Sequence, residues 1–124
     1  MVRDRYILSK LSGLIAEVHV RMSEYNFGAV TAALHSFFLY EFCDLYLELV
    51  KPVVGVGAPE GETKTLAQFT LYVCLEHFLR LTHPLMPYVT EELWQRLPGR
   101  YFKKMEMYAS SLRFHFVVTC SFTP

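Results

Sequence analysis

Residues 80–97 read RLTHPLMPYVTEELWQRL, and this stretch decides the fold because it places a sharp corner between two helical segments. Proline has no backbone N–H and clashes with the preceding turn, so Pro84 is expected to end the incoming helix near His83. Pro87 suits the first turn of the next helix, and acidic side chains follow it at the positive end of the helix dipole. Two helices that meet at such a corner need a core on which to fold.

Apolar periodicity predicts the helices that supply this core. Apolar residues recur at steps of three and four over residues 4–22, and residues 29–51 are apolar around most of a helix's girth. The glycines and prolines of residues 52–63 predict a long loop, with Pro52 closing the long helix. A third helix then leads to the corner. We predict an all-α, antiparallel helical bundle of about four helices.

The composition is sufficient for one compact domain. Of 124 residues, 52% are hydrophobic and 15% are aromatic. Residues 1–100 are predicted to form the helical domain and residues 101–124 a divergent tail, which alternates apolar and polar side chains and is expected to be strand-like or disordered. The expected core residues are Phe38, Phe42, Leu45, Phe78, Leu93 and Trp94.

The charges and cysteines exclude several classes of protein. Twelve basic and twelve acidic residues cancel, so any RNA contact must be local and depend on shape. Cys43, Cys74 and Cys120 show no zinc-ligand spacing, which predicts free thiols in a reducing compartment and no metal site. The sequence has no signal peptide or membrane-spanning run, so a cytoplasmic protein without a membrane partner is expected, with the mitochondrion as the alternative compartment.

No catalytic residue is assigned. Glu41, Asp44 and Glu48 share one side of the long helix and could act as acid and base, but no nucleophile or metal ligand converges on them. A solvated strip is therefore the favoured interpretation. The loop GVGAPEG lacks the order of a phosphate-binding loop and follows a helix, where such a motif requires a strand.

Three blocks resemble, in order and spacing, the helical anticodon-binding domain of the class I aminoacyl-tRNA synthetases. They are DRYILSKL (4–11), LYEFCDLYLELVKP (39–52) and LTHPLMPYVTEELWQRLP (81–98). The isoleucyl and leucyl enzymes share versions of these blocks, and the E-F-C-D-x-Y-L-E form of the middle block is most similar to the valyl-tRNA synthetases.

The resemblance implies a tRNA-binding module that grips the anticodon loop of a valine tRNA. Its partner would be the catalytic domain of a parent valine-tRNA ligase, which uses ATP to charge the tRNA for protein biosynthesis. Neither the H-I-G-H nor the K-M-S-K-S type of signature occurs here. We therefore expect no cofactor in this chain and no aminoacylation by the chain alone.

The resemblance also assigns an RNA-binding face to the middle block. Cys43 and Leu47, one helical turn apart, would contact a base, Tyr40 would stack on one, and Lys51 would extend the row to a phosphate. Further contacts to the RNA backbone are expected from three basic residues of the first helix, Arg3, Arg5 and Lys10.

Two departures from the family leave other functions open. The family's bundle begins with an earlier helix that bears an N-x-x-R-F-like patch, and the tail does not resemble the family, so a truncated or alternatively spliced product of marginal stability is expected. Such a fragment could instead be a helical protein-interaction module without RNA binding, which a large exposed apolar patch would favour. A small enzyme that uses Glu41 and Asp44 or a histidine is the third alternative.

Overall fold

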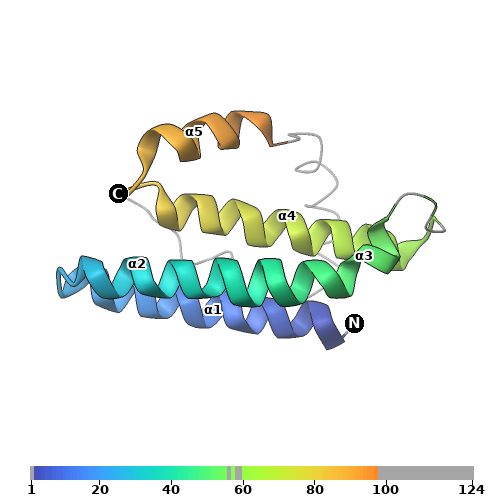
Figure 1. Ribbon diagram of the computed structural model, residues 1–124, viewed down its shortest axis with the longest axis horizontal. Coiled ribbons are helices and arrows are strands. Elements are labelled where there is room, and N and C mark those ends of the chain that lie inside the picture. Colours follow the sequence, from blue (N-terminus) through green and yellow to red (C-terminus); the bar gives the residue numbers. More distant parts are fainter. Residues whose placement is uncertain (1, 56, 58–59, 98–124) are drawn as a thin grey trace.

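Four helical rods run antiparallel in the computed structural model, which describes residues 2–55, 57 and 60–97 (Figure 1). The first rod is α1 (Val2–Ser23), and the second comprises α2 (Phe27–Ser36), the π-helix η1 (Phe37–Leu47) and α3 (Glu48–Val54). The third and fourth rods are α4 (Glu62–Thr82) and α5 (Pro87–Arg96). The prediction of an all-α bundle of about four helices is confirmed.

The second rod is one continuous helix, because the residues at its internal junctions keep right-handed helical dihedral angles. The expectation that Pro52 closes this helix is wrong. Proline removes a single N–H donor, and Val53 and Val54 continue the helix with their side chains packed against the core. The helix ends where the N–H of Gly55 donates to the carbonyl oxygen of Lys51 at 2.9 Å.

The π-helical segment changes which residues of this rod face the core. Its hydrogen bonds join residues five apart, so each turn holds more residues than the 3.6 of an α-helix. The buried residues accordingly recur at steps of five and four, at Phe37, Phe42, Tyr46 and Val50. Leu45 was predicted to lie in the core on α-helical spacing, and this is wrong: its side chain is 40% exposed.

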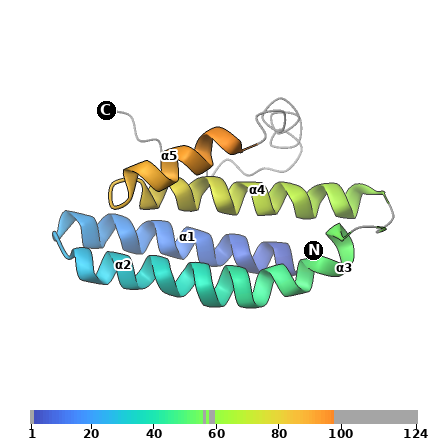
Figure 2. The ribbon, with the colours of Figure 1, turned by 45° about the horizontal axis from the view of Figure 1, so that its top comes forward.

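The core lies between the first three rods. α1 and the α2–η1–α3 rod lie side by side, α4 packs across both, and α5 folds back over α4 (Figures 1 and 2). Phe38 of η1 stacks on Phe78 of α4 with ring centroids 4.4 Å apart. Both of these predicted core residues are half-buried, and Phe42 is buried as expected. The buried core cluster comprises Ile7, Leu11, Leu14, Val18, Val30, Leu34, Phe37, Phe42, Tyr46, Val50, Ala67 and Cys74.

The proline corner forms as predicted. α4 ends at Thr82, whose hydroxyl donates to the carbonyl oxygen of Phe78 at 2.8 Å, and α5 begins at Pro87. Nδ1 of His83 lies 2.8 Å from the hydroxyl oxygen of the buried Thr90, which joins the turn to the first residues of α5. The direction of α5 is therefore set by local hydrogen bonds as well as by packing.

Among the described residues, α5 packs mainly against α4, which covers one of its faces. Trp94 is half-buried on that face, with the guanidinium of Arg80 5.4 Å from its ring centroid. Leu93 was predicted to be in the core, and this is wrong: its side chain is 49% exposed, because no third helix covers it in the described part of the bundle.

The predicted tail, residues 101–124, lies outside the described residues, as does Cys120. The domain boundary at residue 100 and the strand-like or disordered state of the tail stay predictions. Among the described helices, none combines the length and the apolar character that a membrane span requires.

Candidate nucleic-acid interface

The π-helix divides the predicted RNA-binding row of the middle block. Cys43 and Leu47 follow Phe38 at the same steps of five and four as the buried row, and all three are half-buried. Tyr40 instead begins an exposed row with Leu45 and Leu49, and its own side chain is 58% exposed. The four residues thus do not form the single row that α-helical spacing predicts.

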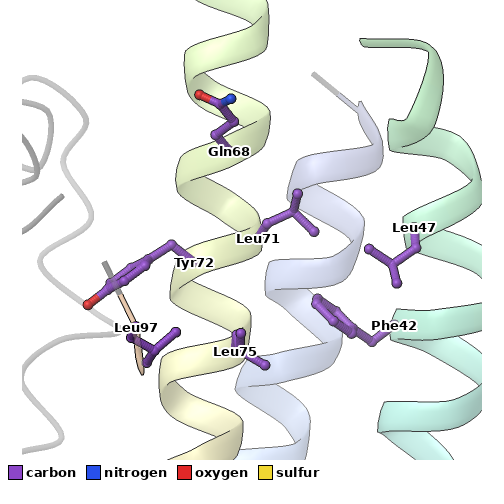
Figure 3. Close-up of a pocket in the computed structure, with 7 residues that line it drawn as sticks. All are labelled: Phe42, Leu47, Gln68, Leu71, Tyr72, Leu75 and Leu97. Carbon is purple, nitrogen blue, oxygen red and sulfur yellow. The ribbon is translucent and has the colours of Figure 1, made fainter. Parts of the chain in front are cut away.

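Leu47 lines an open apolar groove between η1, α4 and the end of α5 (Figure 3). The groove has a volume of about 370 Å³. Among the described residues of the lining, Gln68 has the one amide side chain. Among Tyr40, Cys43, Leu47 and Lys51, the described structure places only Leu47 in this groove. The remaining lining residues are Phe42, Leu71, Tyr72, Leu75 and Leu97.

Cys43 and Cys74 are both free thiols, as predicted. Burial and the nearby negative charge of Asp44 raise the pKa of Cys43, so its side chain stays protonated at neutral pH. A half-buried neutral thiol can make van der Waals contact with a base but is a weak nucleophile. Burial raises the pKa of Cys74 to about 12, in keeping with a core residue.

The predicted basic contacts have different surroundings. Lys51 is exposed and pairs with Glu48, and Arg5 is exposed. Nη1 of Arg3 donates to the carbonyl oxygen of Leu49 at 3.3 Å, so this side chain joins α1 to the second rod. Arg3 therefore has a structural role in the RNA-free chain, whereas Arg5 is open to a phosphate.

Lys10 belongs to a cluster that the sequence did not reveal. Its Nζ lies 3.1 Å from Oε1 of Glu41 and 5.4 Å from the ring centroid of Tyr6, whose hydroxyl donates to Oε2 of Glu41 at 2.9 Å. The hydrogen bond from Lys10 and then that from Tyr6 hold the pKa of Glu41 below its usual value. Glu41 thus joins η1 to α1. The interpretation of Glu41 as part of a solvated strip with Asp44 and Glu48 is therefore wrong for this residue.

In the described part of the chain, one carboxylate of η1 and one of α3 are engaged in ion pairs. Glu41 is engaged by α1, and Glu48 pairs with Lys51 along its own helix. Within residues 2–55, 57 and 60–97, no group of three His, Cys, Asp or Glu side chains could hold a metal ion.

Comparison with known proteins identifies the family. The model described as "Anticodon-binding domain of tRNA ligase" matches residues 4–117. The chain belongs to this family of anticodon-binding domains. It is 50% identical to the valine-tRNA ligase of Takifugu rubripes over 102 residues, which are 80% of this chain and 8% of that ligase.

Similar matches come from other eukaryotes. The chain is 50% identical over 98 residues to the valine-tRNA ligase of Homo sapiens, covering 78% of the chain and 8% of the ligase. It is 44% identical over 97 residues to that of Schizosaccharomyces pombe, covering 78% and 10% respectively. This anticodon-binding domain therefore spans about a tenth or less of the length of the ligases that it matches.

Proposed function

We propose that this chain recognises the anticodon loop of a valine tRNA as part of a valine-tRNA ligase. The observation that carries the proposal is the family match over residues 4–117, together with about half identity to valine-tRNA ligases across most of the chain. In the parent ligase, a separate catalytic domain would use ATP to join valine to the tRNA, in the cytoplasm. This chain would supply the RNA contact alone.

The surface of η1 supports such a contact. RNA loops are read through unstacked bases that lie against apolar or aromatic side chains and form hydrogen bonds along their edges. Cys43 and Leu47 offer a half-buried apolar edge, and Tyr40 offers an exposed ring on the neighbouring side of the same helix. We assign base contact to these three residues and phosphate contact to Lys51 and Arg5.

The balanced charge of the chain supports readout of bases over general attraction to phosphates. Equal numbers of acidic and basic residues leave little long-range attraction to a polyanion, and Lys51 and Lys10 each have a carboxylate partner. Specific binding should therefore depend on the sequence of the loop. The valine preference follows from the similarity to valine-tRNA ligases.

The test is binding of the purified full chain to a valine-tRNA anticodon stem-loop at two salt concentrations, compared with the same stem-loop carrying a changed anticodon. We expect tighter binding to the valine anticodon, with a preference that survives raised salt, because base contacts release few counterions. Equal and salt-sensitive binding to both RNAs, or no binding, would overturn the proposal.

A matched pair of variants locates the phosphate contact. Lys51→Gln should weaken binding severalfold and lower its salt dependence by about one phosphate contact. Arg96→Gln removes another exposed, ion-paired cation, on α5, and should leave binding unchanged. Equal effects of the two variants would contradict the assigned face.

A further inference from the structure

Tyr6 presents an exposed aromatic ring whose hydroxyl is hydrogen-bonded to a neighbouring helix. Its side chain is 41% exposed, yet its hydroxyl donates to Oε2 of Glu41 at 2.9 Å across the seam between α1 and η1. Nζ of Lys10, one turn along α1, lies 5.4 Å from the ring centroid and 3.1 Å from Oε1 of Glu41. Two side chains, Glu41 of η1 and Lys10 of α1, therefore limit the rotation of a ring that solvent still reaches.

An exposed apolar row lies on the same rod as Glu41. Tyr40 precedes Glu41 and begins the exposed row that continues with Leu45 and Leu49. The hydrogen bond from Arg3 to the carbonyl oxygen of Leu49 places the far end of that row near α1. This exposed row therefore approaches α1 at Leu49.

The charges of the cluster cancel, which decides what it can bind. Lys10 and Glu41 carry one charge each, of opposite sign, and they are paired. A neutral cluster gives little attraction to a phosphate, whereas the exposed part of the Tyr6 ring, which has Nζ of Lys10 over one face, can still meet an aromatic partner. Arg5, the residue before Tyr6, is exposed and can meet the phosphate of a nucleotide that lies on the ring.

We propose that Tyr6 is a stacking platform for an unpaired base of the anticodon stem-loop, and that Glu41 is the residue that positions its ring. The inference rests on the proposed function and extends the RNA-binding face from η1 onto α1. Stacking on aromatic side chains tolerates any base, because each base has a π face. A ring that is held in place loses less conformational entropy when a base stacks on it.

The test uses the full chain and an anticodon stem-loop that carries the fluorescent base 2-aminopurine at successive loop positions. We expect quenching at one position, and Tyr6→Leu should abolish that quenching and weaken binding about tenfold. The loss should be the same at low and raised salt, because the contact involves no counterion release. Tyr88→Leu, which removes a 92% exposed ring on α5, should change neither quenching nor affinity.

Tyr6→Phe keeps the aromatic ring and removes the hydroxyl that donates to Glu41. It should keep the quenching, and its affinity should fall only about threefold, since the ring remains but is no longer held by Glu41. Circular dichroism shows whether each variant is folded. If Tyr6→Leu does not fold, the quenching and affinity of Tyr6→Phe test the inference instead. If Tyr6→Phe loses as much affinity as Tyr6→Leu, or loses the quenching, the hydroxyl and not the ring is what matters and the inference fails.

The outcomes also separate this inference from the proposed function. The unaltered chain could bind with anticodon specificity while Tyr6→Leu shows the same affinity and quenching. That result would support the proposed function but overturn the inference, because Tyr6 would then serve only to join α1 to η1. Failure of the unaltered chain to bind the stem-loop would overturn both.

Discussion

The hydroxyl of Tyr46 donates a 2.9 Å hydrogen bond to Oδ1 of Asp4, and both residues are buried where α1 meets η1. Burial, and then the bond to Asp4, raise the pKa of Tyr46, so the phenol stays protonated and can donate at neutral pH. If a buried carboxylate loses a hydrogen-bond donor, the penalty for removing it from water is no longer offset at that oxygen.

Tyr46→Phe should therefore lower the free energy of unfolding by about 1.5–3 kcal/mol, measured by urea denaturation. Tyr40→Phe is the matched control, because the Tyr40 side chain is mostly exposed, and it should change stability by less than about 0.5 kcal/mol. Equal effects of the two variants would show that the Tyr46–Asp4 bond contributes nothing specific.

Two leucines of the second rod test the π-helical register. Leu34 is buried and Leu45 is exposed, although α-helical spacing places both on the core side. Leu34→Ala should cost about 2–5 kcal/mol, as is usual for a buried leucine, and Leu45→Ala about 0.5 kcal/mol or less. Comparable losses in urea denaturation would indicate that the rod keeps an α-helical register.

The link between α4 and α5 depends on Arg80. Its Nη2 lies 2.7 Å from Oε1 of the buried Glu76, and its guanidinium lies over Trp94, the only tryptophan in the sequence. Arg80→Ala should cost about 1–2 kcal/mol, because it takes the guanidinium partner from a buried carboxylate, and should alter Trp94 fluorescence.

Arg96→Ala provides the control for this link. It removes an exposed pair with Glu92 on α5 alone, and it should cost less than about 0.5 kcal/mol. If Arg80→Ala were as mild and left the fluorescence unchanged, the orientation of α5 would depend on the proline corner alone.

The pairing of Glu41 predicts a dependence of stability on pH. The pKa of Glu41 is lowered in the folded chain, first by Lys10 and then by Tyr6. Its contribution is therefore fully present above its ordinary pKa of 4.5 and is lost as the pH falls through the lower folded value.

Unfolding of the unaltered chain and of Glu41→Gln should reveal this contribution. Glu41→Gln should be less stable by under about 1 kcal/mol at neutral pH, since the cluster is partly exposed, and the difference should vanish in strong acid. A difference that does not change with pH would mean that the carboxylate charge is not what joins α1 to η1.

The thiol of Cys43 reports on the proposed RNA face. Burial and then Asp44 raise its pKa, so alkylation should be slow at neutral pH and should quicken as the pH rises. Cys74 is fully buried and should react only after unfolding. A bound anticodon stem-loop should slow alkylation of Cys43 at alkaline pH, measured by mass spectrometry, and unchanged alkylation would place the RNA elsewhere.

Local rules were sufficient to predict several elements. Pro84 and Pro87 determine a corner because proline lacks an N–H, and the structure has α4 ending at Thr82 and α5 beginning at Pro87. The helices and the family resemblance were likewise readable, because both depend on residues that are close together in the chain. Pro52 was misread, since its effect on the helix end is small enough for the packing of Val53 and Val54 to override it.

The arrangement of the candidate site could not be predicted in the same way. A search for periodic apolar residues assumes 3.6 residues per turn, and the wider π-helical turn replaces Leu45 with Tyr46 in the core and separates Tyr40 from Cys43 and Leu47. No local pattern in the sequence marks where such a turn occurs.

The sequence by itself determined the helices, the corner, the absence of strong net charge and the family to which the chain belongs. Only the tertiary structure decided which side chains of η1 meet the core, and that Tyr6 and Lys10 meet Glu41, 35 and 31 residues further along the chain. The physical reason is that backbone preferences act between near neighbours, whereas a contact between two helices depends on the rotation of each about its axis, which only the packed core sets.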